Sequence, residues 1–182
     1  ENFAKTHSNF RVLSLPLDLP TIESPKKRAL ESAFKIAKNE VLLTLDADCL
    51  PKKSWITSMA GRFVDGIGIV QGPKQNNGKR TLPHLYQKLE TLGYTAMEAA
   101  GFSFGHPLVA SAASLAYKKE LFFKVGGFGD LIHLSSGDDD MLIHKMLKIK
   151  GTKVCYNLDK DAVIETAPVH TWKALFNQRA RW

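Results

Sequence analysis

The sequence contains few cysteines and no long hydrophobic run. Only two of its 182 residues are cysteines, Cys49 and Cys155, and they lie far apart without the paired spacing of a zinc site. We therefore expect neither structural zinc nor a disulfide framework, and a reducing compartment fits this cysteine usage. No apolar run approaches the ~20 residues that span a bilayer. Residues 1–10 lack the basic start and apolar stretch of a signal peptide.

Internal repeats, low-complexity segments and basic stretches interleaved with aromatic residues are also missing. The last absence argues against a nucleic-acid partner. The formal net charge of +7 favours an acidic partner, such as a phosphorylated substrate or anionic lipid headgroups, although such a charge also serves solubility alone. With 44% hydrophobic and 24% charged residues, the chain is predicted to form one globular domain.

Segments with helical periodicity alternate with short apolar runs along the chain. Helices are predicted over residues 25–37, 55–63, 82–92, 138–151 and 171–182, and strands over 41–45, 66–72, 108–117, 153–157 and 162–166. Loops are predicted over the polar residues 73–80 and the glycine-rich residues 101–107 and 125–129. Strands that alternate with helices indicate an α/β domain with a largely parallel sheet.

Two aspartates, Asp46 and Asp48, follow the apolar run at 41–45. Ligands of open α/β sheets lie beyond the carboxyl ends of the strands. If the backbone stays extended, residues two apart point to the same side, so both carboxylates would face one ligand. Oxygen ligands of this kind suit Mg²⁺ or Mn²⁺. The alternative is that Asp48 caps the next helix, because Pro51 follows it closely.

A second acidic cluster holds three adjacent aspartates, Asp138, Asp139 and Asp140. Acidic residues in a first helical turn are favoured by the helix dipole, which accounts well for one or two of them. Three adjacent carboxylates repel one another, and this repulsion raises their proton affinity, as a general base requires. The cluster therefore contains a candidate base.

The chain ends in the residues "NQRARW", which include Gln178, Arg179, Arg181 and Trp182. Arginine binds phosphate oxygens in a bidentate manner, and tryptophan offers a flat apolar face to a sugar ring. A polar helix end with favourable arginines is the alternative. Residues 172–176 of the same helix place aromatic and aliphatic side chains on one side, which suits either an interfacial helix or an ordinary surface helix.

The three motifs "LLTLDADC", "SGDDDML" and "QRARW", in this order, resemble the family 2 glycosyltransferases. The similarity runs from about Ser24 to Trp182 and is greatest to the bacterial branch with cellulose and hyaluronan synthases. It implies a GT-A-type, Rossmann-like α/β fold, with a mixed, largely parallel sheet flanked by helices. It also implies metal-dependent, inverting transfer of a sugar from a nucleotide-diphosphate donor to a hydroxyl of a saccharide or a lipid-linked saccharide.

The resemblance also implies roles for the acidic residues. Asp48 would ligate the divalent metal, Mg²⁺ or Mn²⁺, and Asp46 would contact the nucleotide sugar or the metal. Asp138 and Asp139 match the family's acidic pair, which makes Asp139 the expected base for the acceptor hydroxyl, with Asp138 and Asp140 as its neighbours. Metal and arginine would neutralise charge on the departing diphosphate.

Substrate-binding roles follow for residues at both ends of the similarity. Gln178, Arg181 and Trp182 match a Gln-x-x-Arg-Trp motif expected near the diphosphate and the acceptor sugar, and Arg179 lies within it. Lys26 stands at the position of the family's donor-binding lysine, although Pro25 replaces the glycine that commonly precedes it.

The resemblance also suggests that the sequence is one partial catalytic domain, residues 1–182, shortened at both ends. Nothing before Asn9 resembles the family's nucleotide-binding strand, and relatives continue beyond Trp182 into membrane helices. We expect a soluble fragment whose parent protein works at the cytoplasmic face of the cell membrane. Two alternatives are a nucleotidyltransferase, which would need a glycine-rich basic phosphate loop near its start, and a non-catalytic scaffold with degenerate sites.

Overall fold

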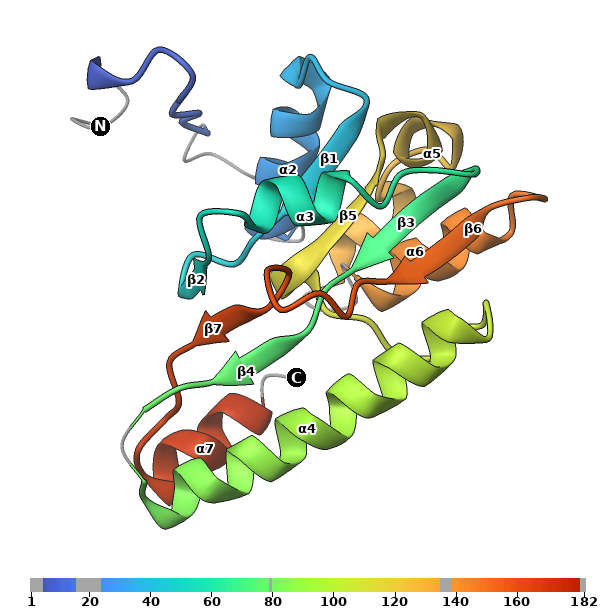
Figure 1. Ribbon diagram of the computed structural model, residues 1–182. Helices are drawn as coiled ribbons and strands as arrows, with labels where there is room; N and C mark the ends of the chain where they lie inside the picture. The colour runs from blue at the N-terminus through green and yellow to red at the C-terminus, as the bar shows by residue number, and fades with distance from the viewer. Residues whose placement is uncertain (1–4, 16–23, 79, 135–138, 181–182) are drawn as a thin grey trace.

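The computed structural model describes residues 5–15, 24–78, 80–134 and 139–180. Figure 1 shows a strand-rich centre with helices on both sides and the long helix α4 along one edge. The helices are α2 (Pro25–Ile36), α3 (Trp55–Ala60), α4 (Leu82–Ser103), α5 (Lys119–Lys124), α6 (Asp140–Leu147) and α7 (Trp172–Arg179), with short 3-10 turns η1 (Ala112–Ser114) and η2 (Gly129–His133). The strands are β1 (Val41–Thr44), β2 (Cys49–Pro51), β3 (Ile67–Gln71), β4 (Lys74–Asn76), β5 (Leu115–Lys118), β6 (Lys153–Tyr156) and β7 (Ile164–Thr166).

The strands form two mixed sheets. The larger has the order β1-β5-β3-β6, in which β5 runs antiparallel to both neighbours and β3 runs parallel to β6. The smaller has the order β2-β7-β4, with β2 antiparallel and β4 parallel to β7. The predicted mixed α/β class is confirmed, but the pairings between described strands are more often antiparallel than parallel, because β5 and β2 both run against their neighbours.

The larger sheet is buried on both faces, as the alternation of its side chains requires. Leu115 and Tyr117 of β5 and Ile69 of β3 point into a cluster with Phe34, Phe102, Phe122 and Phe128 from the surrounding helices and turns. Ala116 and Val70, one position along, point to the other face and pack with Trp55, Met59 and Ile164. The two hydrophobic clusters thus fix the sheet, and with it the end of β1 where the aspartates follow.

The helix predicted over 82–92 is present, but it runs on to Ser103 and faces the opposite way from a core helix. Phe102 near the end of the helix is buried, but the apolar residues of the predicted segment are exposed by between 46% and 72%: Leu82, Leu85, Tyr86, Leu89 and Leu92. Its buried side is polar instead, with His84, Gln87, Thr91 and Glu98 at 2–8% exposure. This polar side packs against β4 and β6. The start of the predicted loop at 101–107 belongs to the helix.

Three elements lie where no helix or strand was predicted. β4 occupies part of the predicted loop 73–80, β2 begins directly after Asp48, and α5 follows β5 without a break. Gly72 allows the chain to pass from β3 to β4, because a Cβ there would lie 2.6 Å from Ser114 Oγ and 2.9 Å from the Ala162 carbonyl oxygen. β4 is held partly by its own polar side chain, since Asn76 Nδ2 donates to Thr91 Oγ1 at 2.8 Å.

Candidate active site

The two aspartates after β1 come together through a turn rather than through an extended backbone. Cys49 N donates to the Asp46 carbonyl oxygen at 3.0 Å, which reverses the chain between β1 and β2. Carboxylate oxygens of Asp46 and Asp48 and the Cys49 Sγ all lie within 4.8 Å of one another. The predicted convergence is therefore found, but the extended geometry offered for it is wrong. Thr44 anchors the start of the turn, since its hydroxyl donates to the carbonyls of Ala112 and Leu115.

The structure contradicts the alternative that Asp48 caps the following helix. That helix, α3, begins only at Trp55, and its N-cap residue is Ser54. Pro51 does not begin a helix either, because it belongs to β2 and pairs with Ile164 of β7. Asp48 is exposed and accepts a hydrogen bond from the Cys49 thiol at 3.7 Å. Its carboxylate thus faces the turn and not a helix end.

Cys49 contributes a neutral thiol to this cluster. Burial, together with the charges of Asp48 and Asp46, raises the pKa of the Cys49 thiol to about 11. At neutral pH the sulfur therefore stays protonated, as its hydrogen bond to Asp48 requires. The donor set that remains consists of carboxylate oxygens, which fits a hard divalent cation such as Mg²⁺ or Mn²⁺ better than a thiolate-bound metal.

Lys26 of α2 lies beside the first aspartate, with its Nζ 3.2 Å from Asp46 Oδ1. Half of the Lys26 side chain and 37% of the Asp46 side chain are exposed to solvent. An ion pair this exposed contributes at most about 1 kcal/mol to stability. The ion pair matters more for position than for stability, because it puts Lys26, the predicted donor-binding lysine, next to Asp46.

A cavity of about 170 Å³ opens next to the aspartates and joins segments that are distant in sequence. Its lining includes Asp46 and Asp48 after β1, and Gln178 and Arg179 of α7. Lys74 of β4 also reaches this cavity, where its Nζ donates to Ser111 Oγ at 3.0 Å. The first and the last predicted motifs thus meet at one site. Arg181 and Trp182 of the last motif lie outside the described residues.

Arg179 is held at the cavity wall by α4. Its Nε donates to both carboxylate oxygens of Glu90 at 3.0 Å, and its Nη2 also contacts Glu90. Its Nη1 donates to Gln178 Oε1 at 2.8 Å. The guanidinium therefore fastens α7 to α4. Figure 1 shows these two helices next to each other. The guanidinium also fixes the position of the Gln178 side chain at the cavity.

The acidic cluster at the start of α6 lies directly behind another wall of this cavity. Asp139 accepts from Ala112 N at 2.9 Å through Oδ2, and from Asp140 N at 3.0 Å through Oδ1. Asp140 accepts from Ala110 N. Ser111 and Ala113, on either side of Ala112, line the cavity. Asp139 is also the N-cap of α6, so the capping interpretation holds for this residue. Asp138 lies outside the described residues.

The sequence did not single out two charged residues close to this site, Lys74 and Glu98. Lys74 lies in the segment predicted to be a polar loop, and its positive charge is the sequence signal for a role at an anionic ligand. Glu98 is buried on the polar side of α4 and accepts from the Tyr156 hydroxyl at 3.3 Å. Burial raises the pKa of the Glu98 carboxyl to about 7, although Lys74 nearby favours its charged form. The sequence signal for a buried carboxylate such as Glu98 would be an acidic residue on the side of a helix that packs inward.

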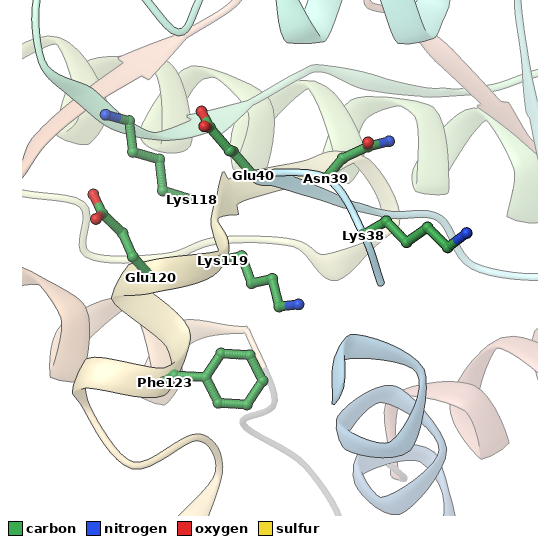
Figure 2. Close-up of a pocket in the computed structure, with 7 residues that line it drawn as sticks. All are labelled: Lys38, Asn39, Glu40, Lys118, Lys119, Glu120 and Phe123. Carbon is green, nitrogen blue, oxygen red and sulfur yellow. The ribbon is translucent and has the colours of Figure 1, made fainter. Parts of the chain in front are cut away.

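A larger cavity of about 510 Å³ lies at the other end of β1 and β5 and contains none of the predicted residues. Figure 2 shows lysine and glutamate side chains of both signs around it, with Phe123 at one edge. Lys119 Nζ donates to the Ala37 carbonyl oxygen at 2.5 Å and lies 5.7 Å from the Phe123 ring centroid. These contacts hold α5 to the turn between α2 and β1. The cavity is therefore best explained as space left where α5 packs against the segment between α2 and β1.

Three solved structures resemble the chain at low identity. One, described as a mycobacterial protein, is 15% identical with a TM-score of 0.41, covering 82% of this chain and 44% of its own. Glucosyl-3-phosphoglycerate synthase from Mycobacterium tuberculosis, in complex with Mn²⁺, UDP-glucose and phosphoglyceric acid, is 14% identical with a TM-score of 0.47, covering 90% and 53%. Mannosyl-3-phosphoglycerate synthase from Rubrobacter xylanophilus is 18% identical with a TM-score of 0.42, covering 85% and 47%. The chain thus spans about half of each structure's length, and the likeness is too distant to transfer a ligand.

The match to a protein family is far more extensive. Residues 2–182 match the family described as "Glycosyltransferase like family 2". No match is found among the curated proteins. The family match includes the acidic turn after β1, the acidic start of α6 and the Gln178 end of α7. The chain belongs to the family 2 glycosyltransferases.

Proposed function

We propose that this chain is the catalytic part of an inverting, metal-dependent enzyme. It would move a sugar from a nucleotide-diphosphate donor to a hydroxyl of a saccharide or lipid-linked acceptor, on a GT-A-type fold. The observation that carries the proposal is the cavity that Asp46, Asp48, Gln178 and Arg179 line together. An acidic pair beside amide and basic groups suits a metal-bound diphosphate.

The residues of the cavity divide the work. Asp48 and Asp46 would hold Mg²⁺ or Mn²⁺, which supplies positive charge to the leaving diphosphate. Lys26 beside Asp46, Gln178, and Arg181 and Trp182 farther along the chain would orient the donor and the acceptor. Arg179 is bound to Glu90, so its role in this motif would be to hold Gln178 in position.

Asp139 is our candidate for the base that takes the proton from the acceptor hydroxyl. Each of its carboxylate oxygens accepts one backbone N–H, which leaves a second lone pair on each oxygen. Two such bonds also fix the orientation of the carboxylate, as proton transfer in the transition state requires. Asp138 and Asp140 are its neighbours, and Asp140 is occupied by the N–H of Ala110.

Metal-dependent donor binding is the test of this proposal. Calorimetry with a panel of nucleoside diphosphates and nucleotide sugars, with and without Mn²⁺, is expected to show binding that needs the metal. Asp48→Ala should weaken that binding by about tenfold or more, as expected for one lost charged ligand. Asp161→Ala is the matched control, because Asp161 belongs to another Asp-x-Asp pair and is ion-paired only loosely with Lys52 at 4.0 Å.

The outcomes separate the alternatives. Unchanged binding in Asp48→Ala would refute the metal assignment. Binding of a nucleotide sugar without transfer to any saccharide acceptor would favour a non-catalytic scaffold. Transfer of the nucleotidyl group instead of the sugar would identify a nucleotidyltransferase.

We further propose that the parent protein works at a membrane surface on the cytoplasmic side. The outer face of α4 presents exposed apolar residues along its length, and Trp172 and Phe176 of α7 are exposed as well. The Tyr86 and Trp172 rings join the two helices, with centroids 5.8 Å apart. Exposed Lys88 and Lys173 lie on the same helices and would meet anionic headgroups. Among the described residues, no helix is long and apolar enough to span a membrane.

A further inference from the structure

The buried carboxylate of Glu98 connects three elements beneath the cavity. Glu98 is only 2% exposed, on the side of α4 that packs against β4 and β6. Its Oε2 accepts from the Tyr156 hydroxyl of β6 at 3.3 Å. A buried carboxylate costs free energy unless polar neighbours compensate it. Here the neighbours are Tyr156, the ammonium of Lys74 and the Gln71 amide, while the charge of Asp140 opposes them.

A chain of polar contacts runs from this carboxylate to the cavity. Lys74 lines the cavity and donates to Ser111 Oγ at 3.0 Å. Ser111 N in turn donates to Gln71 Oε1 at 3.2 Å. Gln71 Nε2 is buried near Glu98 and makes no hydrogen bond of good geometry within the described residues. Gln71 and Lys74 therefore both hold Ser111, which lines the cavity, and the charge of Lys74 acts on Glu98 behind them.

Lys74 differs from the other basic groups at the cavity in what it contacts. Lys26 is ion-paired with Asp46, and Arg179 is ion-paired with Glu90. Within the described residues, Lys74 has a hydroxyl as its hydrogen-bond partner and no carboxylate within 4.0 Å of its Nζ. An ammonium in this setting keeps donor capacity for an anionic oxygen, since it carries three N–H groups.

We propose that Lys74 binds an anionic oxygen of the ligand in this cavity, and that Glu98 is a positioning residue that sets how strongly Lys74 is drawn away from it. The inference rests on the proposed function insofar as that oxygen belongs to the donor's diphosphate. An ionised Glu98 attracts the ammonium toward the interior, whereas a protonated Glu98 leaves its charge to the cavity. Anion affinity should therefore rise when Glu98 is protonated.

The protonation of Glu98 falls in an accessible range of pH. Burial raises the pKa of Glu98 to about 7, Lys74, Tyr156 and Gln71 lower it, and Asp140 raises it. Burial also raises the pKa of Tyr156, so this hydroxyl remains a donor throughout. The groups that face Glu98 are Lys74 from β4, Tyr156 from β6, Gln71 from β3 and Asp140 from α6, and Glu98 changes its charge near neutrality while Tyr156 stays a donor.

Chemical labelling of the Lys74 amine tests both parts without measuring sugar transfer. The protein is treated with an amine-reactive reagent between pH 6 and 9, and Lys74 labelling is followed by mass spectrometry. Mn²⁺ with inorganic pyrophosphate at one fixed pH should slow labelling of Lys74 by about tenfold, as expected if the anion occupies its donors. Lys153, which donates to the Asp65 carbonyl away from the cavity, is the internal control and should label equally.

Variants test the role of Glu98. Glu98→Gln should speed Lys74 labelling several-fold above pH 7, because the carboxylate that holds the ammonium is gone, while Glu98→Asp should restore part of the wild-type rate. Glu120→Gln, on α5, should change nothing. If Glu98→Gln fails to fold by circular dichroism, Glu98→Asp alone must still alter the pH profile of labelling.

The results that would overturn the inference are specific. Lys74 that labels at the same rate with Mn²⁺ and pyrophosphate present, or a wild-type protein that binds no pyrophosphate, refutes the anion site. Equal Lys74 profiles in wild type and both folded Glu98 variants refute the positioning role. A protein that shows protection but transfers no sugar would retain this inference and lose the proposed function.

Discussion

At the scale of single residues, the acidic groups of this chain have structural tasks as well as chemical ones. Asp139 caps α6 and accepts the N–H of Ala112, and Asp140 accepts the N–H of Ala110. Neither contact conflicts with catalysis, because a base must be held in place to act. A substitution that removes the charge of Asp139 but keeps its capping hydrogen bond can therefore separate catalysis from capping.

We expect Asp139→Asn to retain donor binding and to lose transfer by about 10²–10⁴-fold, the usual contribution of a general base. Asparagine has one acceptor oxygen, so it can keep the capping hydrogen bond from Asp140 N but not the one from Ala112 N as well, and a loss of stability of about 1–3 kcal/mol is expected. Calorimetry and a transfer assay on the same protein preparation measure the two properties. Substantial remaining transfer would move the base to Asp138 or Asp140.

Glu98 is expected to make stability depend on pH. Its pKa rises from 4.5 to about 7 in the folded protein, so between these values the folded state binds more protons than the unfolded state. Stability contributed by this group is therefore full below pH 4.5, falls as pH rises toward 7 and then levels off, by roughly 3 kcal/mol in all. Urea unfolding of wild type and Glu98→Gln at pH 5 and pH 8 measures the difference.

The variant should lose that part of the pH dependence and gain stability relative to wild type at pH 8. Glu120→Gln serves as the control, because it changes the net charge equally on the exposed helix α5. Parallel losses in wild type and Glu98→Gln between the two pH values would show that another group is responsible.

At the scale of elements, the contact between α4 and α7 determines where the last motif lies. Glu90 and Arg179 form a partly buried bidentate pair, with side chains 19% and 22% exposed. Removing one partner leaves the other without compensation, which costs more than losing an exposed pair. The pair therefore links the stability of α7 to the shape of the cavity.

Arg179→Met is expected to destabilise the protein by about 1–3 kcal/mol and to weaken donor binding through the displaced Gln178. Lys52→Met is the comparison, because its ion pair with Asp161 is exposed at 4.0 Å and should contribute less than about 1 kcal/mol. A double-mutant cycle with Glu90→Gln isolates the pair. Additive effects of the two substitutions would show that the contact does not couple the helices.

The elements also show how much the sequence could foretell. Long or strongly patterned segments were predicted well: α2, β1, β3, α6 and the helical character of α4 all lie where expected. Strands of three residues, such as β2 and β4, are too short to show alternation, and their pairing with β7 is a tertiary event. The orientation of α4 was also beyond periodicity, because the apolar stripe faces outward and the polar side inward.

For the site, the same limit applies. Asp46, Asp48, Gln178 and Arg179 were predicted from motifs, and they line one cavity. Lys74 and Glu98 have no motif, and their proximity depends on how β4 and α4 pack. The extended geometry proposed for the aspartates also failed, because a turn between β1 and β2 depends on the pairing of β2 with β7.

At the scale of the whole molecule, α4 and α7 together expose several large apolar side chains on their outer surface. Leu89 and Leu92 are 70% and 65% exposed on α4, and Phe176 is 67% exposed on α7. Apolar surface of this extent on one side of a molecule marks an interaction site. With the net charge of +7, the occupant that we propose is an anionic lipid surface.

Co-sedimentation with vesicles tests this at the level of the intact chain. The protein is expected to bind vesicles that contain anionic lipid, and this binding should fall with added salt. A Leu89→Gln/Leu92→Gln double variant should bind at least about tenfold more weakly, because each buried leucine contributes about 1.5–3 kcal/mol. Leu158→Gln is the matched control, since Leu158 is equally exposed at 73% but lies outside α4 and α7. Equal binding by both variants would exclude this face, and self-association lost in the double variant would assign it to a second copy.

The segment that leads into η1 has one more consequence. Its three successive amides, from Ala110, Ser111 and Ala112, are each accepted by a side chain of another element, namely Asp140, Gln71 and Asp139. This part of the cavity wall is thus held through its backbone amides, and side chains of α6 and β3 determine where it lies. These amides should exchange with deuterium as slowly as those of a strand, although this segment is not part of a strand.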